Sequence, residues 1–134
     1  MSNQDLESFY QFVQEKGQLR SREHAYQWSE GVLRTLGENL DRGTKRSLAK
    51  ALPDELADWL TRVFYLLHFR NKELSSQAFQ KKAALRSGNT DARFARQPVI
   101  AVFGGVRQII DSNLDQQVAD TLSPEVRELW QQTL

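Results

Sequence analysis

The sequence contains no cysteine, which excludes disulfide bonds, thiolate metal ligands and thiol nucleophiles from this chain. Only 7 glycines and 3 prolines interrupt its 134 residues, so the composition is not that of a disordered chain. No apolar run approaches the roughly 20 residues that a membrane-spanning helix needs, and the N-terminal segment lacks the apolar core of a signal peptide. We therefore expect one cytoplasmic globular domain.

Sequence motifs for catalysis and metal binding are also missing. There is no G-x-S-x-G motif, and His24 and His68 lie in neither an H-x-x-x-H nor an E-x-x-H arrangement. Residues 99–105 end in two glycines, but they lack the third glycine and the later acidic residue of a dinucleotide-binding loop. We interpret Gly104 and Gly105 as a place where two helices approach closely. We expect no cofactor, no metal and no enzymatic activity, unless distant residues form a cleft.

The chain repeats at an interval of 70 residues, which pairs apolar positions of its two halves. Most of these positions recur at i, i+4 and i+8, which places them on one face of a helix. The pairs include Phe9 with Phe79, Ala25 with Ala95, Val32 with Val102, Leu36 with Val106, Leu48 with Val118 and Leu52 with Leu122. We predict an all-α fold in which two tandem helical pseudo-repeats of about 70 residues, 3–69 and 75–133, pack into one compact bundle.

Each repeat is predicted to contain four helices. Their predicted ranges are 4–16, 21–40, 44–51 and 53–69 in the first repeat, and 76–86, 91–112, 115–121 and 124–132 in the second. Gly17 and Gly43 lie where a chain leaving a helix would take a positive φ. Ser123 precedes Pro124 and is predicted to cap the free amides of the last helix. Trp28 and Trp59 fall on the core faces of their helices.

The end of the fourth predicted helix is apolar on nearly all sides. Residues 63–69 include Phe64, Tyr65, Leu66 and Phe69, which we take as a candidate apolar interface. This pattern predicts burial on more than one side, either between the two repeats or between two copies of the chain.

The net charge of +1 is distributed unevenly. Residues 1–61 carry a net charge of −2, residues 62–96 carry 8 basic and 2 acidic side chains, and residues 97–134 carry −3. The basic residues of the middle segment are Arg62, Arg70, Lys72, Lys81, Lys82, Arg86, Arg93 and Arg96. On one shared surface they would neutralise several phosphates and bind nucleic acid in a salt-dependent way. The alternative is that they cover the solvent faces of elements that point in different directions.

The apolar pattern resembles the DUF2267 family, a bacterial domain of unknown function. The resemblance is carried by Phe9-x-x-Phe12-Val13, Ala25, Val32-Leu33-x-x-Leu36-x-x-x-Leu40, Leu48-Ala49-x-x-Leu52-Pro53-x-x-Leu56, and by Phe79, Ala95, Val102 and Leu122. The second half departs from the pattern of the first by Lys82 in place of Phe12 and Ser123 in place of Pro53. The resemblance implies an all-helical fold and a bacterial cytoplasmic origin, and it implies no activity.

Two functions are consistent with these features. The first is a non-enzymatic interaction domain whose partner is another protein or a second copy of the chain. The second is nucleic-acid binding through residues 62–96, with Arg70, Lys72, Lys81, Lys82, Arg86, Arg93 and Arg96 as the candidate surface. We expect no membrane partner.

Overall fold

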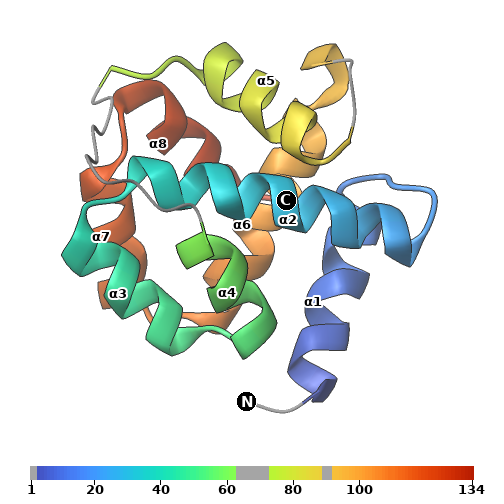
Figure 1. Ribbon diagram of the computed structural model, residues 1–134, viewed down its shortest axis with the longest axis horizontal. Coiled ribbons are helices and arrows are strands. Elements are labelled where there is room, and N and C mark those ends of the chain that lie inside the picture. Colours follow the sequence, from blue (N-terminus) through green and yellow to red (C-terminus); the bar gives the residue numbers. More distant parts are fainter. Residues whose placement is uncertain (1–2, 63–72, 89–91) are drawn as a thin grey trace.

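The computed structural model describes residues 3–62, 73–88 and 92–134, and within these ranges it contains eight α-helices, one short 3-10 helix and no strand (Figure 1). The elements are α1 (Asn3–Lys16), α2 (Arg22–Asn39), α3 (Arg42–Ala51), α4 (Asp54–Arg62), α5 (Ser76–Arg86), η1 (Ala92–Phe94), α6 (Arg96–Ile109), α7 (Ser112–Thr121) and α8 (Pro124–Trp130). The all-α prediction is confirmed. None of the described helices is both long and apolar enough to cross a membrane.

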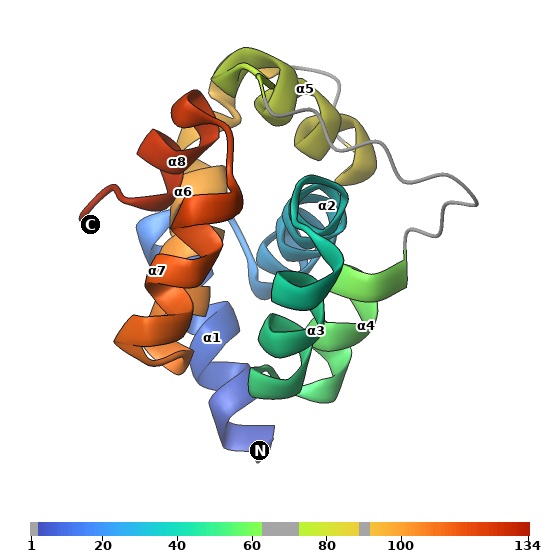
Figure 2. The same ribbon diagram turned by 90° about the vertical axis from the view of Figure 1, so that its left-hand side faces the viewer.

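Helix α2 crosses the middle of the molecule and contacts α1, α4, α5 and α6 (Figure 1). Its residues Val32, Leu33 and Leu36 are fully buried, because neighbouring helices cover it from several sides. In the view along α2, α3 and α4 lie beside it, whereas α6, α7 and α8 form a second layer (Figure 2). The predicted core positions of Trp28 and Trp59 are confirmed, since their side chains are buried.

Helices α1 and α5 each pack against a helix from the other half of the chain. Helix α1 packs against α6, and α5 packs against α2. Glycines allow both close approaches: a Cβ on Gly105 would lie 2.8 Å from the Phe9 ring, and a Cβ on Gly31 would lie 2.5 Å from the Ala83 carbonyl oxygen. The predicted packing role of Gly105 and its neighbour is therefore confirmed.

One pair of corresponding helices in the two halves has matching bounds. Helices α3 and α7 begin and end 70 residues apart. Each is preceded by an aspartate that caps its first turn: Asp41 accepts from the Thr44 amide at 2.7 Å, and Asp111 accepts from the Leu114 amide at 2.8 Å. These intervals are consistent with a tandem repeat, which stays a prediction.

Some predicted helix bounds were wrong. The predicted helix 91–112 is interrupted at Ala95, and α6 begins at Arg96 with Pro98 in its first turn. Proline fits the first turn of a helix, because the backbone N–H that it lacks would have no helical partner there. In a helix interior, the missing N–H and the proline ring would disrupt the hydrogen bonds. Helices α3 and α7 begin earlier than predicted, because the aspartate caps set their starts. The predicted helix 53–69 is described only as far as Arg62, so its last residues lie outside the described ranges.

Three local predictions were also wrong. Neither Gly17 nor Gly43 has a positive φ: Gln18 takes it instead, at 56°, and Gly43 lies inside the first turn of α3. Ser123 does not cap α8 with its side chain. Its hydroxyl donates instead to the Leu74 carbonyl oxygen at 2.7 Å, because the segment before α5 packs against the start of α8.

Candidate functional site

Several predicted site residues lie outside the part of the chain that the structure describes. These are the basic residues Arg70 and Lys72, the apolar residues Phe64, Tyr65, Leu66 and Phe69, and His68. The predicted apolar interface therefore stays a prediction. Among the described residues, no three His, Asp or Glu side chains are grouped in a way that would hold a metal ion.

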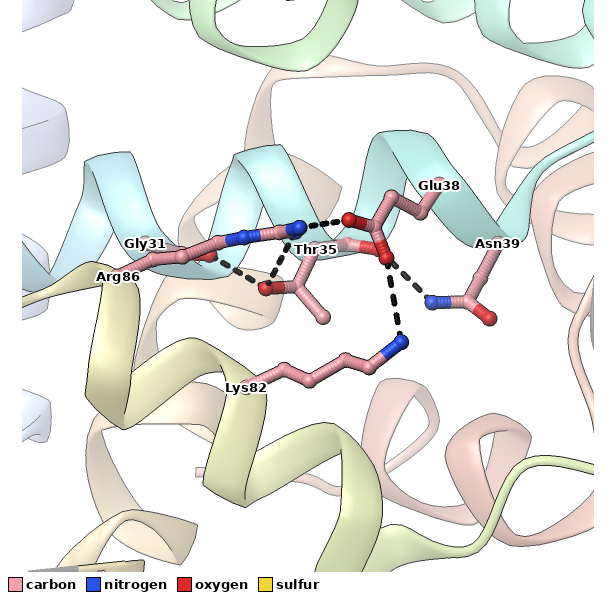
Figure 3. Close-up of polar contacts among 6 residues, drawn as sticks. All are labelled: Gly31, Thr35, Glu38, Asn39, Lys82 and Arg86. Atoms are coloured by element: carbon pink, nitrogen blue, oxygen red, sulfur yellow. Dashed lines mark hydrogen bonds and ion pairs between the residues drawn. The ribbon is translucent and has the colours of Figure 1, made fainter. Parts of the chain in front are cut away.

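Two of the predicted phosphate-binding residues, Lys82 and Arg86, reach a carboxylate inside the fold (Figure 3). They project from α5 toward the buried Glu38 of α2. Arg86 donates to Glu38 and also to Thr35 Oγ1 at 3.3 Å, while Lys82 Nζ lies 3.5 Å from the second Glu38 oxygen. The Thr35 hydroxyl donates in turn to the Gly31 carbonyl oxygen. This polar cluster joins α5 to α2, and phosphate binding by these two side chains would have to compete with Glu38.

The other described basic residues of the middle segment have different surroundings. Lys81 is exposed on α5, and Arg62 is exposed at the end of α4. Arg93 and Arg96 lie on η1 and at the start of α6, where they line a cleft. The predicted basic surface is therefore divided into separate environments. Lys82 and Arg86 pair with Glu38, whereas Arg93 and Arg96 line a cleft.

This cleft, which we call the arginine cleft, has a volume of about 610 Å³. It lies between the turn that joins α1 to α2, the start of α2 and the start of α6. Its charged and aromatic lining residues are Arg20, His24, Trp28, Arg93, Phe94 and Arg96. None of the described residues that line it carries a carboxylate, so its surface is positively charged.

The start of α6 strengthens this positive charge. Arg96, Gln97 and Pro98 line the arginine cleft, and Ala95 provides no side-chain cap for the helix. The partial positive charge of the helix N-terminus is therefore close to the cleft. Gln97 Nε2 donates to the Lys16 carbonyl oxygen at 2.7 Å and so holds the start of α6 against the end of α1.

The arginine cleft also has an apolar component. Trp28 is buried beside it, whereas Phe94 is 72% exposed, more than any other large apolar side chain in the described ranges. The Arg93 guanidinium lies 5.6 Å from the centre of the Phe94 ring, within the range of a cation–π contact. Aromatic and arginine side chains are both enriched in protein interfaces.

Arg20 and Arg96 both line the arginine cleft. In the three described ranges, neither guanidinium is in an ion pair with a carboxylate. His24, in the first turn of α2, is half-buried and lines the same cleft. The arrangement offers two guanidinium groups to an incoming anion, with an aromatic surface next to them.

Gln18, in the wall of the arginine cleft, has the left-handed backbone conformation that favours glycine. We expect Gln18→Gly to raise the free energy of unfolding by about 1 kcal/mol, because it removes the steric cost of a Cβ at this φ. Gly88, with a φ of 81° and open space where a Cβ would lie, is the matched control for the opposite change. Gly88→Ala should lower stability by about 1 kcal/mol. Urea unfolding measures both, and destabilisation by Gln18→Gly would contradict the expectation.

Sequence reasoning identified only part of the arginine cleft. The charge count selected Arg93 and Arg96, but it gave no reason to join them to Arg20 and Trp28, which lie in the other half of the chain. No local signal predicted this proximity, because it depends on how α1, α2 and α6 pack together. Phe94 was missed because it was assigned to a continuous helix rather than to a separate turn.

The comparisons with known proteins identify a family. The family model described as "Uncharacterized conserved protein (DUF2267)" matches residues 6–132. This range includes every described residue of the arginine cleft and of the polar cluster between α2 and α5. No curated protein matches the chain.

Proposed function

This chain belongs to the DUF2267 family, and since the family's description assigns no activity, we propose a function from the site: a non-enzymatic interaction domain. In this proposal the arginine cleft binds an acidic segment of another protein. The observation that carries it is the lining of the cleft, where arginines and exposed aromatic surface occur together and none of the described lining residues is a carboxylate.

Carboxylates are the protein groups that this lining would bind best. A guanidinium presents two parallel N–H donors to a carboxylate, which gives both strength and orientation. The volume of about 610 Å³ is within the usual range for a ligand pocket and would admit a few side chains. An apolar side chain of the same segment would pack against Phe94. We therefore propose a short segment in which acidic residues flank an aromatic or aliphatic one.

The chemistry of the cleft favours binding over catalysis. Among its described lining residues, His24 is the single imidazole that could act as a general acid or base. No hydroxyl, ammonium or carboxylate side chain from the described ranges lines the cleft beside it to act as a nucleophile or as a second acid or base. Recognition of a charged segment requires none of these groups.

A displayed library of short random peptides tests the proposal. We expect enrichment of peptides that combine Asp or Glu with an aromatic residue. Arg93→Glu with Arg96→Glu should weaken binding of an enriched peptide by about tenfold or more, because it replaces attraction by repulsion. The control is Arg46→Glu with Lys50→Glu, which makes the same change in charge on α3, and circular dichroism checks that both variants are folded. Enrichment of basic peptides, or equal losses in both variants, would contradict the proposal.

A second copy of the chain is the competing partner. Light scattering over a range of protein concentrations distinguishes it from a different protein. A monomer at all concentrations agrees with the proposal. A dimer that dissociates in the Arg93→Glu, Arg96→Glu variant would show that the cleft serves self-association instead.

A further inference from the structure

Helix α3 carries four basic side chains on one face. Arg42, Lys45, Arg46 and Lys50 are spaced at i, i+3, i+4 and i+8, and all four line a second groove of about 440 Å³ together with Thr61 of α4. The helix contains no acidic residue. Arg42 and Lys50 are eight residues apart, which places the four cations along about 12 Å of helix axis. We call this surface the α3 face.

The described part of the fold does not neutralise these charges. In the part of the chain that the structure describes, none of the four side chains is in an ion pair, whereas Lys82 and Arg86 both reach Glu38. Like charges at i, i+4 spacing destabilise a helix, so the arrangement has a cost that no described intramolecular contact offsets. A bound polyanion would offset it.

The positive charge of Lys45 is also destabilised by its surroundings. It is half-buried, and its burial together with the nearby Arg42 lowers the pKa of its ammonium group below the ordinary value. Both causes disfavour the charged form of lysine. A phosphate in the groove would act in the opposite direction, because a nearby negative charge stabilises the ammonium.

From this geometry we propose that the α3 face binds the sugar–phosphate backbone of a nucleic acid. Four cations along one helix face match a ligand whose negative charges repeat at a short interval, about 3.4 Å along the axis for each DNA strand. An α-helix also fits the major groove, which is about 12 Å wide. Contacts of this kind carry affinity without sequence preference, since they reach phosphates rather than base edges.

The α3 face suits a nucleic acid better than a membrane or a protein. Within the described ranges, the exposed large apolar side chains are Tyr26, Leu85, Phe94 and Leu134, and none of these is on α3. Membrane-surface helices insert an apolar face, and protein interfaces have an apolar or aromatic centre. The α3 face has several cations but, in the described ranges, no exposed large apolar side chain, so it lacks both. The proposal is independent of the arginine cleft, which does contain an aromatic centre.

This site differs from the one that charge counting predicts. The basic helix lies within residues 1–61, whose net charge is −2, so an average over that segment conceals it. The predicted segment 62–96 has the higher net charge, yet two of its cations face Glu38. Searching for unpaired cations on one helix face therefore identifies the α3 face, whereas averaging the net charge over a long segment identifies residues 62–96.

Fluorescence anisotropy with short labelled duplex DNA, single-stranded DNA and hairpin RNA tests the proposal. We expect binding at low salt to at least one of these probes. If all four cations contact phosphates of a duplex, the logarithm of the binding constant should fall with the logarithm of salt concentration at a slope of about −3.6. No binding of any probe at low salt would overturn the proposal.

Substitutions locate the binding surface. Arg46→Gln with Lys50→Gln changes two exposed side chains and should reduce the slope to about −1.8, while Arg46→Glu with Lys50→Glu should weaken binding by more than about tenfold. The charge-matched control, Arg93→Glu with Arg96→Glu, should retain most of the binding. Equal losses of binding in the two Glu variants would overturn the assignment to α3. The proposal would also be overturned if the unchanged chain bound phosphatidylserine vesicles but none of the nucleic-acid probes. Because each pair serves as the other's control, failure of this proposal is distinguishable from failure of the peptide-binding proposal.

Discussion

Replacing Gly37 by alanine is expected to lower the free energy of unfolding by about 3 kcal/mol, because overpacking at this site cannot be relieved by a side chain. A Cβ on Gly37 would lie 2.0 Å from the carbonyl oxygen of Leu60 and 3.1 Å from its carbonyl carbon. Both atoms belong to the backbone of α4, so α2 and α4 would have to move apart. Urea unfolding followed by circular dichroism measures the effect.

Gly43 provides the matched control for this substitution. It is also in a helix, but the nearest atom to its added Cβ is Asp41 Oδ1 at 3.8 Å, an ordinary contact distance. Because alanine favours helix over glycine by up to about 1 kcal/mol, Gly43→Ala should be neutral or stabilising. If the two substitutions had the same effect, close packing between α2 and α4 would not be the reason for the glycine at position 37.

Removing the buried carboxylate of the α2–α5 cluster is expected to have a comparable effect. Glu38→Ala should lower the free energy of unfolding by about 3 kcal/mol, since loss of one partner leaves a partly buried charge uncompensated. The Arg86 side chain is 25% exposed, which keeps the expected loss at the lower end of the range for buried ion pairs. The same unfolding measurement tests this prediction.

An exposed ion pair serves as the control for Glu38. Glu7 and Arg22 are joined by a hydrogen bond of 2.9 Å from Arg22 Nε, but their side chains are 58% and 47% exposed. Solvent screens such a pair, so Glu7→Ala should produce no measurable change. Glu38→Leu with Arg86→Leu should recover most of the lost stability, because it removes both charges. A large loss from the double substitution would show that packing, rather than the unpaired charge, explains the effect.

Much of the helical organisation could be predicted from local patterns. The apolar faces that contain Trp28 and Trp59 were identified from helical spacing, and the packing role of Gly105 followed from the argument against a dinucleotide loop. These predictions succeeded because an amphipathic helix has to bury its apolar face whichever helix covers it. Helix starts were less predictable: the caps Asp41 and Asp111 were not recognised, and their helices begin earlier than expected.

The exceptions to local reasoning have tertiary causes. The Ser123 hydroxyl donates to the Leu74 carbonyl oxygen instead of capping its own helix. Glu38, counted among the acidic residues of the first segment, lies between two cations of the basic segment. A side chain's partner depends on which helix packs against its own, and the spacing of residues in the sequence does not predict which helices pack together.

The sequence by itself determined that this chain, without cysteine and with few helix-breaking residues, forms amphipathic helices. It also placed four cations on one face of α3, although a segment average conceals them. The tertiary structure alone decided that α1 packs on α6 and α5 on α2, and so brought Arg20 beside Arg93 and Arg96. The physical reason is that burial of apolar area is nonspecific and encoded within each helix, whereas a binding site depends on which polar side chains the packed helices bring together.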